Sequence, residues 1–122
     1  MQQPRPAFGV IFGCLTLGVI ALTGLTASAA PQVHEFTISG EQYAFSPSRI
    51  DVQKDEIVKI TFSAKDIAHS FTIDQYRISK RAGAGQTVMF EFRADQPGSF
   101  TYYCNLSQDE KCKGMRGQLV VK

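Results

Sequence analysis

Residues 58–62 read Val58-Lys59-Ile60-Thr61-Phe62, and residues 87–93 read Thr87-Val88-Met89-Phe90-Glu91-Phe92-Arg93. In both stretches apolar and polar side chains alternate, so every second side chain points to the same face of an extended chain. β-branched and aromatic residues fill the apolar positions, which favours strand over helix. Both stretches are therefore predicted to be half-buried β-strands.

The same alternation recurs on either side of these two stretches. Five more strands are predicted, at residues 34–39, 49–53, 70–74, 99–103 and 118–121. Turn signals separate the strands at Ser46-Pro47-Ser48, Gly83-Ala84-Gly85 and Gln96-Pro97-Gly98. Seven to eight short strands at this spacing, with no helical stripe between them, predict an all-β fold, a Greek-key antiparallel β-sandwich.

Length and composition agree with one small globular domain. The chain has 122 residues, of which 43% are hydrophobic and 20% charged, and its net charge is +2. Acidic and basic residues are mixed along the chain without a basic stripe, which argues against nucleic acid as a partner.

The first thirty residues differ from the rest of the chain. Residues 7–25 carry no charge, and the small residues Ala27-Ser28-Ala29 follow them. This layout predicts a signal peptide at residues 1–29 and a mature domain at residues 30–122. The mature domain would then be periplasmic or secreted. The alternative is an uncleaved anchor at residues 7–25, the one case in which the membrane is a partner. Cys14 does not fit a lipoprotein signal, because apolar sequence continues well past it.

Four side chains in the predicted domain have metal-ligand chemistry. Cys104 ends one strand, Cys112 and Met115 lie on the long connection that follows it, and His69 begins a different strand. Thiolate, thioether and imidazole are soft to borderline ligands, which suit copper better than magnesium or calcium. Zinc bound by His69 and the two cysteines is a further alternative, but a thioether is a poor zinc ligand.

Each of these residues also has a plain structural interpretation. Cys104 and Cys112 could form a disulfide, since disulfides persist in an oxidising compartment. Such a bond would consume both thiolates and exclude the copper site in that state. His69 could simply cap a strand edge, and Met115 could fill a gap in the packing. The other histidine of the predicted domain, His34, is interpreted as a surface residue.

Several motifs together resemble the cupredoxins. They are Tyr43-Ala44-Phe45-Ser46-Pro47, residues 57–62, His69-Ser70-Phe71-Thr72-Ile73, residues 97–104 and residues 114–121. The resemblance covers nearly all of residues 32–122. It is strongest to the iron-transport-associated cupredoxin-like domains and to the copper domain of cytochrome oxidase subunit II.

The resemblance implies copper ligands, but the ligand loop is degenerate. In binuclear copper members the loop reads Cys-x3-Cys-x3-His-x2-Met, which here places Cys104, Gln108, Cys112 and Met115 at the four ligand positions. Gln108 removes the second bridging thiolate, which argues against a binuclear centre. Cys112 stands where the family has a second histidine, and this leaves a mononuclear set of His69, Cys104, Cys112 and Met115.

The sequence therefore predicts an exported protein that binds one copper ion, for electron transfer or Cu(I) carriage, with a redox or copper-transfer protein as partner. The alternative is a metal-free sandwich with a Cys104–Cys112 disulfide, acting as an accessory or interaction domain. No Cys-x-x-Cys pair or Ser/His/Asp set is evident, so the protein is not predicted to be an enzyme.

Overall fold

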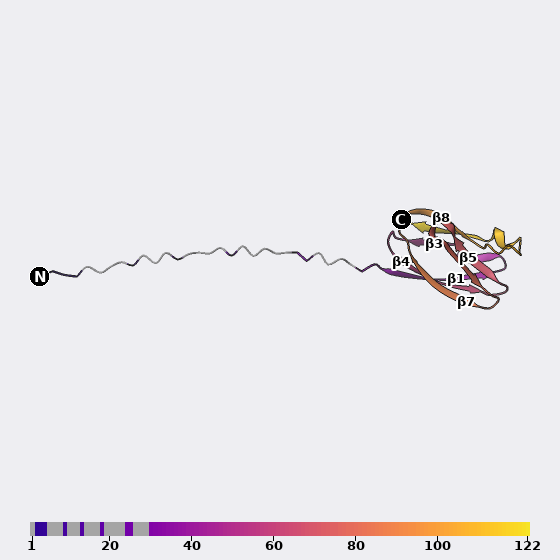
Figure 1. Ribbon diagram of the computed structural model, residues 1–122, viewed down its shortest axis with the longest axis horizontal. Helices are drawn as coiled ribbons and strands as arrows, with labels where there is room; N and C mark the ends of the chain where they lie inside the picture. Colours follow the sequence, from indigo (N-terminus) through magenta and orange to yellow (C-terminus); the bar gives the residue numbers. More distant parts are fainter. Residues whose placement is uncertain (1, 5–8, 10–12, 14–17, 19–23, 26–29) are drawn as a thin grey trace.

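Two β-sheets packed face to face make up the domain (Figure 1). The computed structural model describes residues 2–4, 9, 13, 18, 24–25 and 30–122. Most of the predicted export segment, including Cys14, lies outside the described residues. Within the described part of the chain no helix is long and apolar enough to cross a membrane.

Nine strands form the two sheets. They are β1 (Val33–Glu41), β2 (Ala44–Ser46), β3 (Arg49–Val52), β4 (Ile57–Ala64), β5 (His69–Ile73), β6 (Ile78–Ala82), β7 (Thr87–Arg93), β8 (Gly98–Tyr103) and β9 (Arg116–Val121). Two single 3₁₀ turns join them, η1 (Asp74–Tyr76) and η2 (Cys112–Gly114). The predicted all-β sandwich is confirmed, with nine strands in place of seven or eight.

The two strands missed by the sequence prediction are β2 and β6. Strand β2 has only three residues, too few for an alternating pattern. In β6, three consecutive residues are exposed because this strand lies at the edge of its sheet. Edge strands are often short or polar, so the periodicity of buried residues is weak there.

The strand order is β2-β1-β4-β7 in one sheet and β3-β9-β8-β5-β6 in the other. Most pairings are antiparallel, as predicted. However, β1 pairs with β4 in parallel, with Val33 opposite Ile57, and β3 pairs with β9 in parallel, with Arg49 opposite Gln118. A parallel pair needs a crossover connection between its strands. Alternation and turn residues do not reveal such crossovers, which is why the sequence predicted antiparallel pairing throughout.

Aromatic side chains fill the space between the sheets. The rings of Phe71 and Tyr102 stack at 4.8 Å between centroids, and Phe45 meets Tyr102 edge-on at 5.2 Å. The alternating residues Val58, Ile60 and Phe62 are all fully buried beside them. These side chains come from both sheets, so their burial holds the two layers together.

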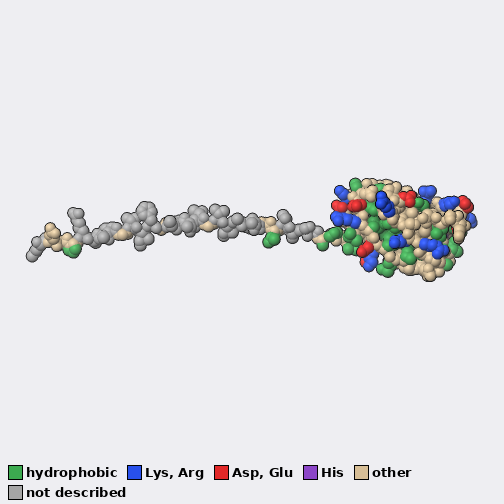
Figure 2. Space-filling view, viewed as in Figure 1, with side chains coloured by type: hydrophobic (Ala, Val, Ile, Leu, Met, Phe, Trp, Pro, Cys, Tyr) green, Lys and Arg blue, Asp and Glu red, His purple; other side chains and the backbone are tan. Residues whose placement is uncertain are grey.

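The predicted ligands lie at one end of the sandwich. Strand β5 begins there with His69, strand β8 ends there just before Cys104, and β9 starts there just after Met115. The β1–β2 turn, with Gln42 and Tyr43, lies at the same end, since Gln42 hydrogen-bonds to Asp66 and Tyr43 packs against His69. On the face seen in Figure 2, acidic and basic side chains are interspersed over the domain.

Substitution of Gly117 by alanine should be strongly destabilising. Gly117 pairs with Tyr102 across β8 and β9, and a Cβ at this position would overlap the Tyr102 ring. The ring has little room to move, because it is buried and its hydroxyl donates a hydrogen bond to Pro47 O at 2.8 Å. Overpacking of this kind costs about 1–3 kcal/mol or more. Urea unfolding of Gly117→Ala should show this loss.

Gly114→Ala is the matched control, because a Cβ there has no neighbour within 4 Å. Its unfolding free energy should change by less than about 0.5 kcal/mol. Equal stability of the two variants would contradict this description of the packing between Tyr102 and Gly117.

Candidate metal centre

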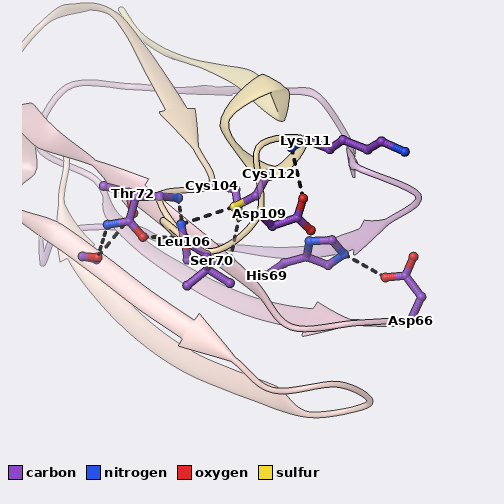
Figure 3. Close-up of a disulfide and its surroundings, with 11 residues drawn as sticks. Asp66, His69, Ser70, Thr72, Cys104, Leu106, Asp109, Lys111 and Cys112 are labelled. Atoms are coloured by element: carbon purple, nitrogen blue, oxygen red, sulfur yellow. Dashed lines mark hydrogen bonds and ion pairs between the residues drawn. A yellow bond between two sulfur atoms is a disulfide. The ribbon is translucent and has the colours of Figure 1, made fainter.

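Cys104 and Cys112 form a disulfide (Figure 3). Their Cα atoms lie 5.2 Å apart, and the bond closes a segment with a sequence separation of eight. Both residues are buried, with 0% and 1% exposure. Of the two interpretations that the sequence left open for these cysteines, the structure contains the disulfide.

Backbone N–H groups point at both sulfur atoms. The N–H of Ser70 on β5 lies 3.4 Å from Cys104 Sγ, and the N–H of Leu106 lies 3.3 Å from Cys112 Sγ. These contacts connect each sulfur to a neighbouring strand or loop. After reduction the same two donors would favour the thiolate forms, because hydrogen bonds to a charged group stabilise it.

His69 is fully buried and held by Asp66. The His69 Nε2 atom lies 2.7 Å from Asp66 Oδ1. Asp66 also accepts hydrogen bonds from the backbone N–H groups of Gln42 at 2.8 Å and Ile67 at 2.7 Å. These two backbone donors, and then His69, lower the pKa of the Asp66 carboxyl to about 2. Asp66 is therefore an ionised acceptor that orients the imidazole ring.

The other ring nitrogen of His69 has no partner. Nδ1 is buried and makes no hydrogen bond. An ionised carboxylate only accepts hydrogen bonds, so Nε2 must carry the proton in the contact with Asp66. Nδ1 of the neutral ring then keeps its lone pair. In the view of Figure 3, Nε2 faces Asp66 on the side of the ring away from the disulfide.

Met115 completes the predicted set. It is 1% exposed, and its N–H donates to Cys112 O at 3.0 Å. The Cys104 N–H points at Met115 O at 3.4 Å. The structure thus brings His69, Cys104, Cys112 and Met115 to one end of the sandwich.

The four residues are not an open ligand set in this state. With the sulfurs bonded to each other, the described residues contain no group of three or more His, Cys, Asp or Glu side chains that could hold a metal ion. The prediction that both cysteines act as thiolate ligands does not apply to the disulfide, since its sulfurs carry no negative charge. The ligand set stays a prediction for the reduced protein, in which the lone pair of His69 Nδ1 and the donor types fit a soft metal ion.

A polar network next to the site was not foreseen from the sequence. Ser70 Oγ donates to Asn105 Oδ1 at 2.7 Å, and Asn105 N–H donates to Ser70 Oγ, also at 2.7 Å. Asn105 Nδ2 reaches Ser79 Oγ at 3.0 Å. Ser70 and Asn105, which follow His69 and Cys104, are therefore hydrogen-bonded to each other, and this fixes the relative position of the two predicted ligands.

Asp66 and Tyr43 were also missed as parts of the site. Asp66 precedes His69 by three residues, and this short spacing was the available signal for it. Tyr43 begins one of the motifs that resemble the cupredoxins, but it lies far from His69 in the sequence, and nothing in that motif marks it as part of the site. His34 is a surface residue, as predicted, with its Nδ1 atom 3.2 Å from Glu56 and its ring stacked on Phe36.

Comparison with known proteins agrees with this fold. A family model described as the cupredoxin-like domain matches residues 14–121. No curated protein matches the chain.

Three solved structures illustrate the similarity of the fold. A chain of a heme-copper terminal oxidase dimer has a TM-score of 0.68 at 19% identity, over 75% of this chain and 65% of that one. The metal-binding domain of the Streptococcus pneumoniae Cu(I)-exporting P-type ATPase CopA, solved with Cu(I), has a TM-score of 0.64 at 18% identity, over 78% and 91%. Auracyanin A, a blue copper protein from Chloroflexus aurantiacus, has a TM-score of 0.63 at 18% identity, over 74% and 99%.

The two-sheet sandwich with its loop between β8 and β9 defines a cupredoxin-like protein. The chain belongs to the family of cupredoxin-like domains, because the family model spans most of its length. These three structures are below 20% identical to the chain, so they establish the fold and not the ligands.

Protein prepared without reductant should contain no free thiol at Cys104 or Cys112. Peptide mapping after alkylation should recover the two cysteines in one cross-linked species. Reduction should lower the unfolding free energy by about 2–3 kcal/mol, as loop entropy gives for a short closed segment. Urea unfolding with and without a phosphine reductant measures this difference.

The double variant Cys104→Ala/Cys112→Ala is the control, and its stability should not respond to the reductant. Alkylation of both cysteines in unreduced, folded protein would show that the disulfide does not form.

The neutral ring of His69 should be the tautomer with a proton on Nε2. Long-range ¹H–¹⁵N correlation spectra report this directly, because protonated and unprotonated ring nitrogens resonate at different shifts. Asp66→Ala should remove the preference, since the acceptor for Nε2–H is lost, while the His34 signals stay unchanged. A proton found on Nδ1 in the native protein would refute the assigned hydrogen bond.

Proposed function

We propose that this domain binds one copper ion, as Cu(I), when Cys104 and Cys112 are reduced. The ligands would be His69 through Nδ1, the two cysteine sulfurs, and the thioether of Met115. The disulfide form is then the metal-free state of the same site.

The observation that carries this proposal is the free Nδ1 atom of His69. It is buried, it has no hydrogen-bond partner, and it belongs to a ring that Asp66 holds in place. A buried polar atom without a partner costs about 1–3 kcal/mol. Metal-binding histidines characteristically donate their other ring N–H to a carboxylate or carbonyl, as His69 does to Asp66.

The chemistry of the donors favours Cu(I) over other ions. Two thiolates and a thioether are soft ligands, and soft ligands select Cu(I). Met115 counts against zinc, whose usual ligands are thiolate, imidazole and carboxylate. When bound, copper supplies a soft Lewis-acid centre and a one-electron redox couple. This chain's part is to bury the donors and to hold His69 and Cys104 in register through Ser70 and Asn105.

Proteins with this fold give precedent for copper binding. The similar domain of CopA was solved with Cu(I), and auracyanin A is a blue copper protein. Here the second cysteine in the loop favours Cu(I) carriage over electron transfer, because two thiolates stabilise Cu(I) more than the usual pair of imidazoles does.

We propose that the protein is exported. The Cys104–Cys112 disulfide suits an oxidising compartment, as does the predicted signal peptide at residues 1–29. We propose that the partner is a copper-transfer or redox protein and that the domain itself is not an enzyme.

A second candidate function rests on the disulfide itself. If Cys104 and Cys112 stay oxidised throughout, the chain is a metal-free sandwich that acts as an accessory or interaction domain. The buried position of both sulfurs favours this alternative, because burial slows reduction.

Reduced protein should bind one equivalent of Cu(I), and the disulfide form should bind none. Competition with a chromogenic Cu(I) chelator under anaerobic conditions measures the affinity. His69→Ala should weaken binding by at least tenfold, since even groups that only support a metal ligand contribute about 10- to 100-fold. Met115→Leu should weaken it by a smaller factor.

The chain offers matched controls for both variants. His34→Ala removes the surface histidine, and Met89→Leu alters a methionine that is 62% exposed. Both should bind Cu(I) like the native protein. A colourless adduct that is stable in air indicates carriage, and an intense thiolate-to-Cu(II) absorption band indicates electron transfer. Equal affinities for His69→Ala and His34→Ala would contradict the proposed site.

A further inference from the structure

Reduction of the Cys104–Cys112 disulfide requires that the structure around it opens, and the loop between the two cysteines lies against it, with the Leu106 N–H 3.3 Å from Cys112 Sγ. The two cysteines are 0% and 1% exposed, so a thiol in solution has no direct approach to either sulfur. Residues 105–111 form the part of the loop between the two cysteines. Whatever holds these residues against the rest of the domain therefore controls the reduction.

Tyr43 contacts this loop through Lys111. Lys111 Nζ lies over the Tyr43 ring, 5.4 Å from its centroid. The carboxylate of Asp109, on the same loop, raises the pKa of the Tyr43 phenol. Asp109 Oδ1 accepts the Lys111 N–H at 3.0 Å, which ties these two loop residues to each other.

The fold holds Tyr43 firmly in this position. Gln42 and Tyr43 both have left-handed backbone conformations, with φ of 50° and 58°. Non-glycine residues adopt these conformations at a cost, and such residues cluster at functional sites. The Gln42 N–H is anchored to Asp66 at 2.8 Å, and the Tyr43 ring meets His69 edge-on at 6.0 Å between centroids.

We infer that Tyr43 is a latch that holds residues 105–111 over the disulfide and so controls its reduction by an exported dithiol. When the loop lifts away from Tyr43, a thiolate of the dithiol attacks one of the two sulfurs. A mixed disulfide forms, and the other cysteine leaves as a thiolate. The second thiol of the reductant then displaces the remaining cysteine. In total the dithiol supplies two electrons and two protons and becomes a disulfide itself.

The latch concerns the disulfide alone and needs no metal. Its consequence for copper rests on the proposed function: reduction precedes Cu(I) binding, so Tyr43 would limit how fast the site becomes available. Loss of the latch would speed this step without altering the donors of the site.

The test is the rate at which dithiothreitol reduces the disulfide in metal-free protein, followed by quenched alkylation and mass spectrometry. Tyr43→Ala should be reduced about tenfold faster than the native protein, which corresponds to about 1.4 kcal/mol of lost loop contacts. Tyr43→Phe keeps the ring beneath Lys111 but lacks the hydroxyl, so its rate should fall between the two.

Lysine variants of the loop give a matched pair. Lys111→Ala removes the ammonium group above Tyr43 and should speed reduction about threefold. In free energy this is about half of the effect expected for Tyr43→Ala. Lys113→Ala removes the same charge from the same loop, but the Lys113 side chain faces Glu110 at 3.5 Å. It should be reduced at the native rate. Equal rates for the two lysine variants would overturn the latch.

The variant Tyr76→Ala is the control that distinguishes loss of the latch from a general loss of stability. Tyr76 lies at the opposite end of the sandwich, where its hydroxyl donates to Gln96 O at 2.9 Å. Unfolding free energies of this variant and of Tyr43→Ala are measured alongside the rates. The latch requires that Tyr43→Ala accelerates reduction more than Tyr76→Ala does for the same loss of stability. If the rates follow stability alone, Tyr43 has no such role, and the copper proposal is unaffected.

Discussion

The hydrogen bond between Asp66 and His69 is the contact on which the candidate site depends. It joins the β4–β5 connection to the first residue of β5. The Asp66 carboxylate also accepts the Gln42 N–H, which fixes the β1–β2 turn. Because the carboxylate occupies Nε2, the lone pair of the neutral ring lies on Nδ1, which is buried and unpartnered. Asp66 therefore orients the imidazole and, through the Gln42 N–H, anchors the turn that carries Tyr43.

The sulfur atoms give this site two chemical states. In the disulfide state Cys104 and Cys112 close the loop and stabilise a small domain whose core alone is modest. In the dithiol state the same atoms are soft ligands, next to N–H groups that already point at them. We expect the fold to change little between these two states, because Ser70 and Asn105 fix His69 relative to Cys104 without using either sulfur.

Much of the fold was predictable because burial between two sheets imposes a period of two. Val58, Ile60 and Phe62 show it directly. The parallel pairing of β1 with β4 was not predictable in this way, since periodicity does not record which strands become neighbours. The four candidate ligands were found from their donor chemistry and from the cupredoxin resemblance. Asn105 and Tyr43 were not, because their roles arise from contacts between distant segments. Asp66 was overlooked although it precedes His69 by only three residues.

In the reduced protein, the two cysteine sulfurs and the His69 imidazole are proposed to bind copper at the end of the sandwich. X-ray absorption at the copper edge, on reduced protein loaded with one equivalent of Cu(I), tests it most directly. We expect sulfur atoms and a single imidazole nitrogen in the first coordination sphere, with the nitrogen absent in His69→Ala. A copper ion surrounded only by nitrogen and oxygen, or unchanged by that substitution, would contradict it.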